Sequence, residues 1–290
     1  MNTMLWHKLY NFFTWIWHNL FRWPVRLHVA YDNKFARPQL TIVFLHGISA
    51  NSDTWRATCR QFEKDPALEK VRLVALDLLG FGKSLRADWL DYVYFDYEYA
   101  LDRTLKRLKV HGPVVLIGHS MGSLIAADYA TNFTPSVDLK KLILVSPPVL
   151  MASEVAKLPD KVYAKSYAAL HNIATDIPAA DVIARLVQRF SSFRSYYIKT
   201  AAFAKSMEEI ILNPKNYQTF THIQIPTTII HGYFDPLVMG SNLRRAAKAN
   251  PRHLKYISAL GHHDISVAKR AKILLEIKKA LKNESQAQTL

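Results

Sequence analysis

Residues 114–123 read VVLIGHSMGS, and this stretch decides the fold. Its first four residues are apolar and predict a short strand buried on both faces, whereas SMGSLIAADYA, which starts at Ser120, predicts a helix. Gly118 and Gly122 flank Ser120 in the pattern Gly-x-Ser-x-Gly, where a side chain at either glycine would collide with the neighbouring strand or helix. Such a turn lifts the Ser120 hydroxyl clear of the sheet, and the N–H of Met121 points towards developing oxyanion charge.

Strand and helix patterns alternate on both sides of this turn. Apolar runs predict strands at 25–31, 39–45, 71–76, 142–145, 227–230 and 254–257. Helical patterns lie between or after them, near 52–62, 97–110, 242–249 and 265–281. In the last of these, one face is expected to point inward and the other outward: inward Val267, Ala271, Leu274, Ile277 and Leu281, and outward Lys269, Lys272, Lys279 and Lys282. The alternation predicts an α/β fold with a mostly parallel sheet flanked by helices.

Two later residues are candidates to activate Ser120. A serine hydroxyl is a poor nucleophile unless a base removes its proton, and that base works best when a carboxylate fixes its tautomer. Asp235 follows a predicted strand in HGYFDPLV, and His262 follows the next strand in ALGHH. Loops after parallel strands open at one edge of the sheet, so the three side chains can meet.

The chain resembles the α/β-hydrolase superfamily in five segments in their expected order: HGISANSDTW, DLLGFGKS, GHSMGS, HGYFDPLV and GHH. The resemblance implies that Ser120 is the nucleophile, His262 the general base and acid, and Asp235 the orienting carboxylate. It also implies an oxyanion hole formed by the backbone N–H groups of Ile48 and Met121. Asp77, His46, His119 and His231 correspond to positions that organise loops rather than react.

The choice between the neighbouring histidines rests on the motif alone. His263 adjoins His262, and we prefer His262 because the base of the family directly follows a glycine. The alternative position for the acid, after residues 142–145, has no carboxylate before Glu154, which favours Asp235. The resemblance implies no cofactor. A metal site at residues 262–264 is disfavoured, because adjacent side chains point apart and no spaced ligands accompany them.

The domain organisation follows from the same segments. We expect an amphipathic aromatic-rich helix at 1–24, the hydrolase core at 25–148 and 223–290, and an inserted helical cap at 149–222, where the strand rhythm gives way to helix formers. Few residues precede His46-Gly47, so we expect one strand fewer than the family usually has at the start of its sheet.

The first helix has two interpretations that the sequence leaves open. Its apolar face contains Trp6, Leu9, Phe13, Ile16, Trp17 and Leu20. Polar residues interrupt every apolar run, which argues against a signal peptide or a membrane span. The face fits either peripheral contact with a membrane surface, or packing on the protein itself or on a second copy.

The composition limits the cellular compartment and the classes of binding partner to be expected. Cys59 is the only cysteine, which fits a reducing, cytoplasmic environment and predicts a small buried residue in a helix. The formal net charge is +15, but the basic residues are scattered and no nucleic-acid motif accompanies them, so we expect no nucleic-acid partner.

These observations predict a serine hydrolase that cleaves carboxylic esters through an acyl-enzyme on Ser120. A serine at this turn argues against chemistry that needs a carboxylate nucleophile. The expected substrate is a small-molecule ester with an apolar group, since aromatic residues are frequent in the predicted cap. Two alternatives stay open: a related serine hydrolase that cleaves carbon–carbon, amide or thioester bonds, and a binding protein that keeps the fold without turnover.

Overall fold

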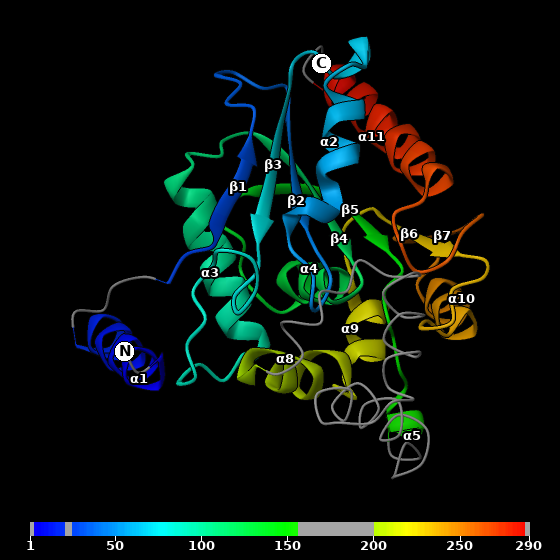
Figure 1. Ribbon diagram of the computed structural model, residues 1–290. Coiled ribbons are helices and arrows are strands. Elements are labelled where there is room, and N and C mark those ends of the chain that lie inside the picture. The colour runs from blue at the N-terminus through cyan, green and yellow to red at the C-terminus, as the bar shows by residue number, and fades with distance from the viewer. Residues whose placement is uncertain (1–2, 21–24, 156–199, 288–290) are drawn as a thin grey trace.

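The computed structural model describes residues 3–20, 25–155 and 200–287 (Figure 1). Its centre is a seven-stranded sheet with the order β1-β3-β2-β4-β5-β6-β7. The strands are β1 (His28–Asp32), β2 (Leu40–Leu45), β3 (Val71–Asp77), β4 (Pro113–His119), β5 (Asp138–Val145), β6 (Thr227–Gly232) and β7 (Leu254–Ala259).

All neighbouring strands pair in parallel except β1, which lies antiparallel to β3 at the edge. The interior strand β2 has the sequence LTIVFL, and all six residues are buried, as expected for a strand covered on both faces. Ile42 of β2 pairs with Leu73 of β3 on one side and Val115 of β4 on the other. The predicted α/β fold with a mostly parallel sheet is therefore confirmed.

Helices cover both faces of the sheet. One hydrophobic cluster packs α3, α4, α8, α9 and α10 against one face, and a second packs α2 and α11 against the other (Figure 1). The α-helices are α1 (Thr3–Asn19), α2 (Arg56–Phe62), α3 (Tyr94–Arg107), α4 (Met121–Thr131), α5 (Ala152–Val155), α8 (Ala201–Ser206), α9 (Asn216–His222), α10 (Gly240–Ala249) and α11 (Val267–Ala287). Shorter turns are η1 (Ser52–Trp55), η2 (Pro66–Leu68) and the π-helical η4 (Met207–Ile211).

Cys59 lies in helix α2 and is buried, which confirms the prediction of a buried or half-buried residue in a helix. Its side chain is buried in the cluster that joins α2 and α11 to β2 and β3. Burial and the nearby charge of Glu63 raise the pKa of the thiol to about 12. The thiol therefore stays protonated at neutral pH.

The predicted inward face of α11 is confirmed in part. Ile277 is buried, and Leu274 and Leu281 pack against the same hydrophobic cluster. The first turn does not follow the prediction. Val267 is 72% exposed, whereas Lys269 is fully buried. The buried residues of α11 are Lys269, Ile273, Glu276, Ile277 and Ala280. Two of these five residues are charged, so the hydrophobic pattern does not reveal the face on which they lie.

The segment predicted as a cap is only partly described. Residues 152–155 and 201–222 contain α5, α8, η4 and α9, which agrees with a helical composition there. The rest of the expected cap, 156–199, lies outside the described residues. The domain boundaries thus stay predictions.

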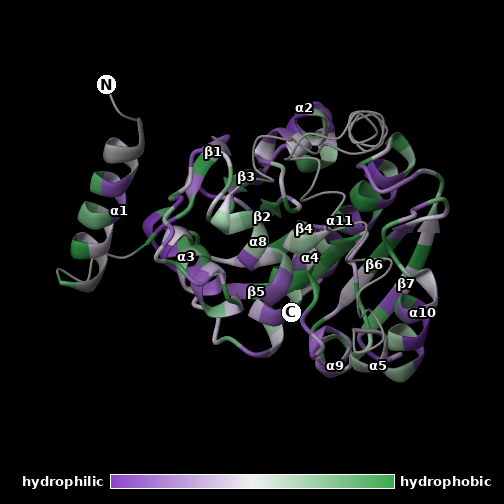
Figure 2. Ribbon diagram, turned by 60° about the horizontal axis from the view of Figure 1, so that its bottom comes forward, coloured by the Kyte–Doolittle hydropathy of each residue, from purple (hydrophilic) through white to green (hydrophobic). Residues whose placement is uncertain are grey.

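Helix α1 lies beside the body of the protein and touches it through polar side chains (Figures 1 and 2). Asn11 exchanges two hydrogen bonds of 3.0 Å with Asp88, one to its carboxylate and one from its backbone N–H. Thr14 accepts a hydrogen bond of 3.0 Å from the Trp89 indole. Each helix in the described parts of the chain, α1 included, is too short or too polar to span a bilayer.

Candidate active site

Ser120 occupies a strained turn between β4 and α4. Its backbone has φ 52° and ψ −120°, a conformation that non-glycine residues rarely adopt and that clusters at functional sites. Its N–H donates to the Val145 carbonyl at 2.9 Å, which ties the turn to β5. A Cβ at Gly118 would lie 2.3 Å from the Gly122 carbonyl oxygen. Only glycine at 118 therefore lets the strand and helix approach closely enough to form this turn.

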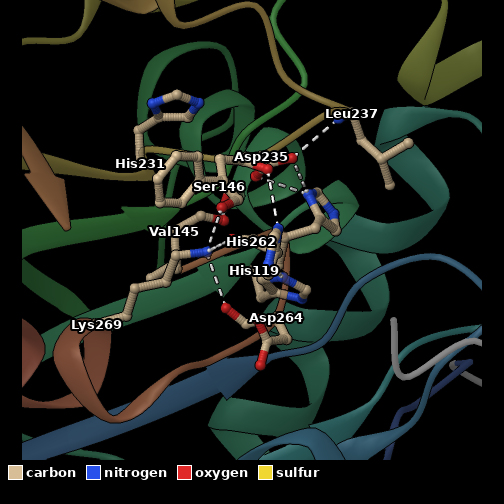
Figure 3. A network of polar contacts seen from close by, with 12 residues as sticks. His119, Val145, Ser146, His231, Asp235, Leu237, His262, Asp264 and Lys269 are labelled. Carbon is tan, nitrogen blue, oxygen red and sulfur yellow. Dashed lines mark hydrogen bonds and ion pairs between the residues drawn. The ribbon is translucent and has the colours of Figure 1, made fainter. Parts of the chain in front are cut away.

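Asp235 and His263 form a buried pair at the same edge of the sheet. His263 Nδ1 lies 3.0 and 2.9 Å from the two carboxylate oxygens of Asp235, and both residues are less than 10% exposed, at 5% and 8%. Asp235 follows β6, where its N–H donates to Gly232 and its carboxylate accepts from the N–H of Leu237 (Figure 3). A carboxylate held this way fixes the tautomer of an imidazole.

The ionised state of Asp235 depends on its neighbours. Burial by itself would raise the pKa of this carboxyl. The hydrogen bond and charge of His263, the Ser146 side chain and the N–H of Leu237 outweigh burial and lower the pKa to about 2. Asp235 is therefore an acceptor at neutral pH.

The expected contact between Asp235 and His262 is wrong. The His262 side chain is exposed, and its Nδ1 lies 3.1 Å from the backbone carbonyl of Phe234. Consecutive residues of the loop after β7 point in different directions, so only one histidine can face the carboxylate. That residue is His263. The glycine before His262 favours that residue in the sequence, but it does not indicate which of the two side chains points towards Asp235.

The other histidines near the edge support loops, as the resemblance implied. His119 Nε2 donates to the His263 backbone carbonyl at 2.7 Å, and the two rings lie 5.0 Å apart between centroids. His46 Nε2 accepts from the N–H of Leu78 at 2.9 Å, while its Nδ1 donates to Gly47. Burial lowers the pKa of His46 to about 4 and that of His119 well below its usual value. Both rings are therefore neutral at physiological pH.

The loop after β2 lies against Ser120. A Cβ at Gly47 would lie 3.0 Å from the Ser120 Cβ, so the backbone that carries Ile48 runs directly beside the candidate nucleophile. Met121 is the first residue of α4 and follows Ser120. The backbone N–H groups of both predicted oxyanion residues thus belong to segments that meet at Ser120.

Asp77 ties together the loops below this edge. Its carboxylate accepts hydrogen bonds from the backbone N–H groups of Ser52 and Lys83, each at 2.9 Å, and lies 3.0 Å from His28 Nδ1. Burial would raise the pKa of Asp77, but these hydrogen bonds lower it. Asp77 therefore acts on loop structure, in agreement with its expected role.

Apolar side chains stand exposed beside the Asp235–His263 pair. They come from the loops after β6 and β7: Tyr233 (71% exposed), Phe234 (54%), Leu237 (43%), Met239 (42%) and Leu260 (69%). Exposed apolar residues gathered next to a site commonly contact an apolar ligand. Among the described side chains, no group of three or more His, Cys, Asp or Glu residues is arranged to hold a metal ion.

Two residues near the pair were not predicted. Lys269 of α11 and Ser146, which follows β5, lie next to Asp235 (Figure 3). Ser146 belongs to the segment after β5, where the sequence offers no carboxylate before Glu154 and a serine gives no signal of its own. Lys269 gives no sequence signal, because lysines on a terminal helix usually face solvent.

Comparison with known proteins identifies the family of the chain. The model of the alpha/beta hydrolase fold family matches residues 41–268. The chain belongs to this family.

Several similar curated proteins carry lipid-hydrolase names, and others are named only as uncharacterized proteins. A probable lysophospholipase, BODYGUARD 4 of Arabidopsis thaliana, is 31% identical over 134 residues, which are 44% of this chain and 31% of that protein. The chain thus matches about a third of that relative's length. Monoacylglycerol lipase ABHD6 of Bos taurus is 25% identical over 94% of this chain and 88% of its own.

Solved structures share the fold. An esterase from Exiguobacterium antarcticum superposes with a TM-score of 0.62 at 21% identity, covering 88% of this chain and 95% of its own. A carboxylesterase structure from Nitrososphaera gargenis reaches a TM-score of 0.65 at 18% identity, covering 90% and 96%. The fold and family together define the chain as an alpha/beta hydrolase.

Proposed function

We propose that the protein is a serine hydrolase that cleaves carboxylic esters with an apolar acyl or alkyl group. Ser120 is the nucleophile, His263 the general base and acid, and Asp235 the orienting carboxylate. The observation that carries the proposal is the buried Asp235–His263 pair, with 2.9 Å between its nearest atoms, at the same sheet edge as the strained turn of Ser120. This arrangement has the order and roles of a Ser-His-Asp triad.

The mechanism follows from these roles. His263 takes the proton of Ser120 as its oxygen attacks the ester carbonyl, and Asp235 stabilises the imidazolium that results. The N–H groups of Ile48 and Met121 stabilise the tetrahedral oxyanion. The alcohol then leaves with the proton from His263, and a water activated by His263 hydrolyses the acyl-enzyme.

The substrate class rests on the surroundings of the pair. The exposed apolar residues 233, 234, 237, 239 and 260 offer contacts to a hydrocarbon chain. The names of the curated relatives, a lysophospholipase and a monoacylglycerol lipase, point in the same direction. We therefore favour lipid-like monoesters over short polar esters.

Hydrolysis of p-nitrophenyl esters of increasing acyl length tests the substrate class. We expect kcat/KM to rise from the acetate to a medium or long chain, because each buried methylene contributes about 0.8 kcal/mol. Replacement of Phe234 by serine should reduce this dependence on chain length, since its side chain is 54% exposed beside His262. Phe95→Ser on α3, where the side chain is 60% exposed, serves as the control. Highest activity on the acetate would contradict the lipid-like assignment.

Helix α1 supports a second part of the proposal, that the protein binds the surface of an anionic membrane. Asn11 and Thr14 turn one side of the helix towards the body of the protein. The apolar side chains Trp6 (59% exposed), Leu9 (38%), Phe13 (54%), Trp17 (52%) and Leu20 (71%) remain accessible. A helix with accessible tryptophans on a chain of net charge +15 is suited to anionic headgroups.

Vesicle flotation tests the membrane contact. The full chain should float with vesicles that contain phosphatidylglycerol and less with pure phosphatidylcholine, because the anionic surface attracts the basic protein. The double replacement Phe13→Ser and Leu20→Ser should reduce flotation, whereas Phe95→Ser should not. Equal flotation of the double variant would contradict the proposal. A dimer in sedimentation that the double variant loses, without flotation of the wild type, would instead assign the face to self-association.

A further inference from the structure

Lys269 is the most deeply buried cation near the candidate site. Its side chain is fully inaccessible, although it lies in the first turn of the surface helix α11. Burying a charged ammonium group is costly unless hydrogen bonds compensate. The contacts of Lys269 therefore indicate what the residue stabilises.

The ammonium group binds three acceptors around the candidate base. Nζ donates to the carbonyl of His262 at 2.5 Å and to that of Asp264 at 2.8 Å. These carbonyls lie on either side of His263 in the chain. The third hydrogen bond, of 2.8 Å, goes to Ser146 Oγ (Figure 3). All three N–H groups of the ammonium are thus used.

Ser146 extends this contact to Asp235. Its oxygen accepts from Lys269, and its side chain lies near enough to the Asp235 carboxylate to help lower the pKa of that carboxyl. The carboxylate also accepts from His263. Polar contacts therefore connect the ammonium to the hydroxyl, the hydroxyl to the carboxylate and the carboxylate to the imidazole.

We propose that Lys269 is a positioning residue of the active site, which holds the loop of His263 from both sides and orients Asp235 through Ser146. The inference rests on the proposed function, because it assumes that His263 and Asp235 act on Ser120. Lys269 itself touches neither the nucleophile nor a substrate.

The charges around Lys269 give the proposal a pH dependence. Burial lowers the pKa of Lys269 to about 8, while the carboxylates of Asp235 and Asp264 oppose this shift. Charged and titratable residues surround the Lys269 ammonium. They are Asp235 and His231 from β6 and the loop after it, His119 from β4, and His262, His263 and Asp264 from the loop before α11. As pH rises through about 8, the amine loses its charge and one donor. The hydrogen bonds of Lys269 to the loop carbonyls and to Ser146 therefore weaken.

A fluorophosphonate probe that reacts with the activated serine tests this inference at several pH values. In the wild type, labelling of Ser120 should decline on the alkaline side around pH 8. In Lys269→Met, labelling at neutral pH should be about 10- to 100-fold slower, the range expected when a reactive group is misplaced, and the decline near pH 8 should be absent. Ser146→Ala should also slow labelling and remove that decline, and it tests the same set of polar contacts if Lys269→Met does not fold.

Lys141→Met is the matched control. Lys141 of β5 binds Glu276 of α11 at 2.8 Å, so it joins the same strand and helix as the Lys269–Ser146 contact but lies away from the site. It should lower the melting temperature and leave the pH profile of labelling unchanged. A merely structural role for Lys269 predicts that the two lysine variants behave alike, and that result would overturn the inference. So would folded Lys269→Met or Ser146→Ala protein with the rate and pH profile of the wild type.

Failure of the proposed function has a different outcome. In that case the wild type itself shows no labelling that depends on Ser120. Normal labelling of the wild type with unchanged Lys269→Met leaves the proposed function standing and refutes only the role of Lys269.

Discussion

Replacement of Ser120 by alanine should lower kcat for a p-nitrophenyl ester by at least about 10⁴-fold. The variant lacks the oxygen that forms the acyl-enzyme, while the neighbouring N–H groups and the His263–Asp235 pair remain. Alanine also fits the backbone at 120 about as well as serine, so the fold should persist. Steady-state hydrolysis together with circular dichroism measures both effects.

Ser123 provides the control for this experiment. It lies one turn further along α4, is fully buried, and donates through Oγ to the Gly118 carbonyl at 2.7 Å. Ser123→Ala should lower stability by about 1 to 3 kcal/mol, the cost of leaving a buried acceptor unpaired, with activity within about threefold of the wild type. Substantial activity in Ser120→Ala would exclude Ser120 as the nucleophile.

The adjacent histidines should differ sharply when each is replaced by glutamine. His263→Gln should lower kcat/KM by about 10³- to 10⁴-fold, because glutamine can occupy the space beside Asp235 but cannot accept and return a proton at neutral pH. His262→Gln should change kcat/KM by less than about tenfold, since the residue is exposed and its Nδ1 lies 3.1 Å from the backbone carbonyl of Phe234.

Each histidine variant serves as the control for the other, because both replace histidine by glutamine in the same loop. Measurement of kcat/KM at the pH of highest wild-type activity separates them. If His262→Gln were the inactive variant, the base would be the residue that follows the glycine, and the Asp235–His263 contact would be structural.

The central turn and the sheet were predictable because their signals are local. Gly118 lets β4 approach α4, and Gly122 lets α4 approach the backbone of Leu45 and His46 at the end of β2. The apolar runs of β2 and β4 are continuous because those strands are covered on both faces. The strand ends then place Asp235 and a histidine at one edge. The turn, the sheet and the placement of these two residues depend on their spacing in the sequence and on a parallel sheet. The alternation of strands and helices indicates that sheet.

The spacing of the strands did not predict which histidine faces Asp235. His262 and His263 are chemically equivalent in sequence, and the direction of each side chain depends on the loop after β7. That loop is held by His119 and Lys269, which lie 144 and 7 residues from the carbonyls they bind. Neither contact produces a periodic pattern.

The buried face of α11 shows the same limit. Lys269 and Glu276 are placed inward by polar partners on β5 and in loops: Ser146 in one case and Lys141 in the other. A pattern of apolar residues assigns charged side chains to solvent. It therefore fails where a charge is buried for a specific contact.

The burial of Cys59 has a practical consequence for labelling experiments. The chain has a single cysteine, and its thiol is 3% exposed, so maleimide reagents should hardly react with the native protein. A cysteine introduced by Leu20→Cys directly after α1, where the native side chain is 71% exposed, would then be the only reactive thiol. A fluorophore or spin label attached there would report the polarity around that helix, with no native cysteine to remove first.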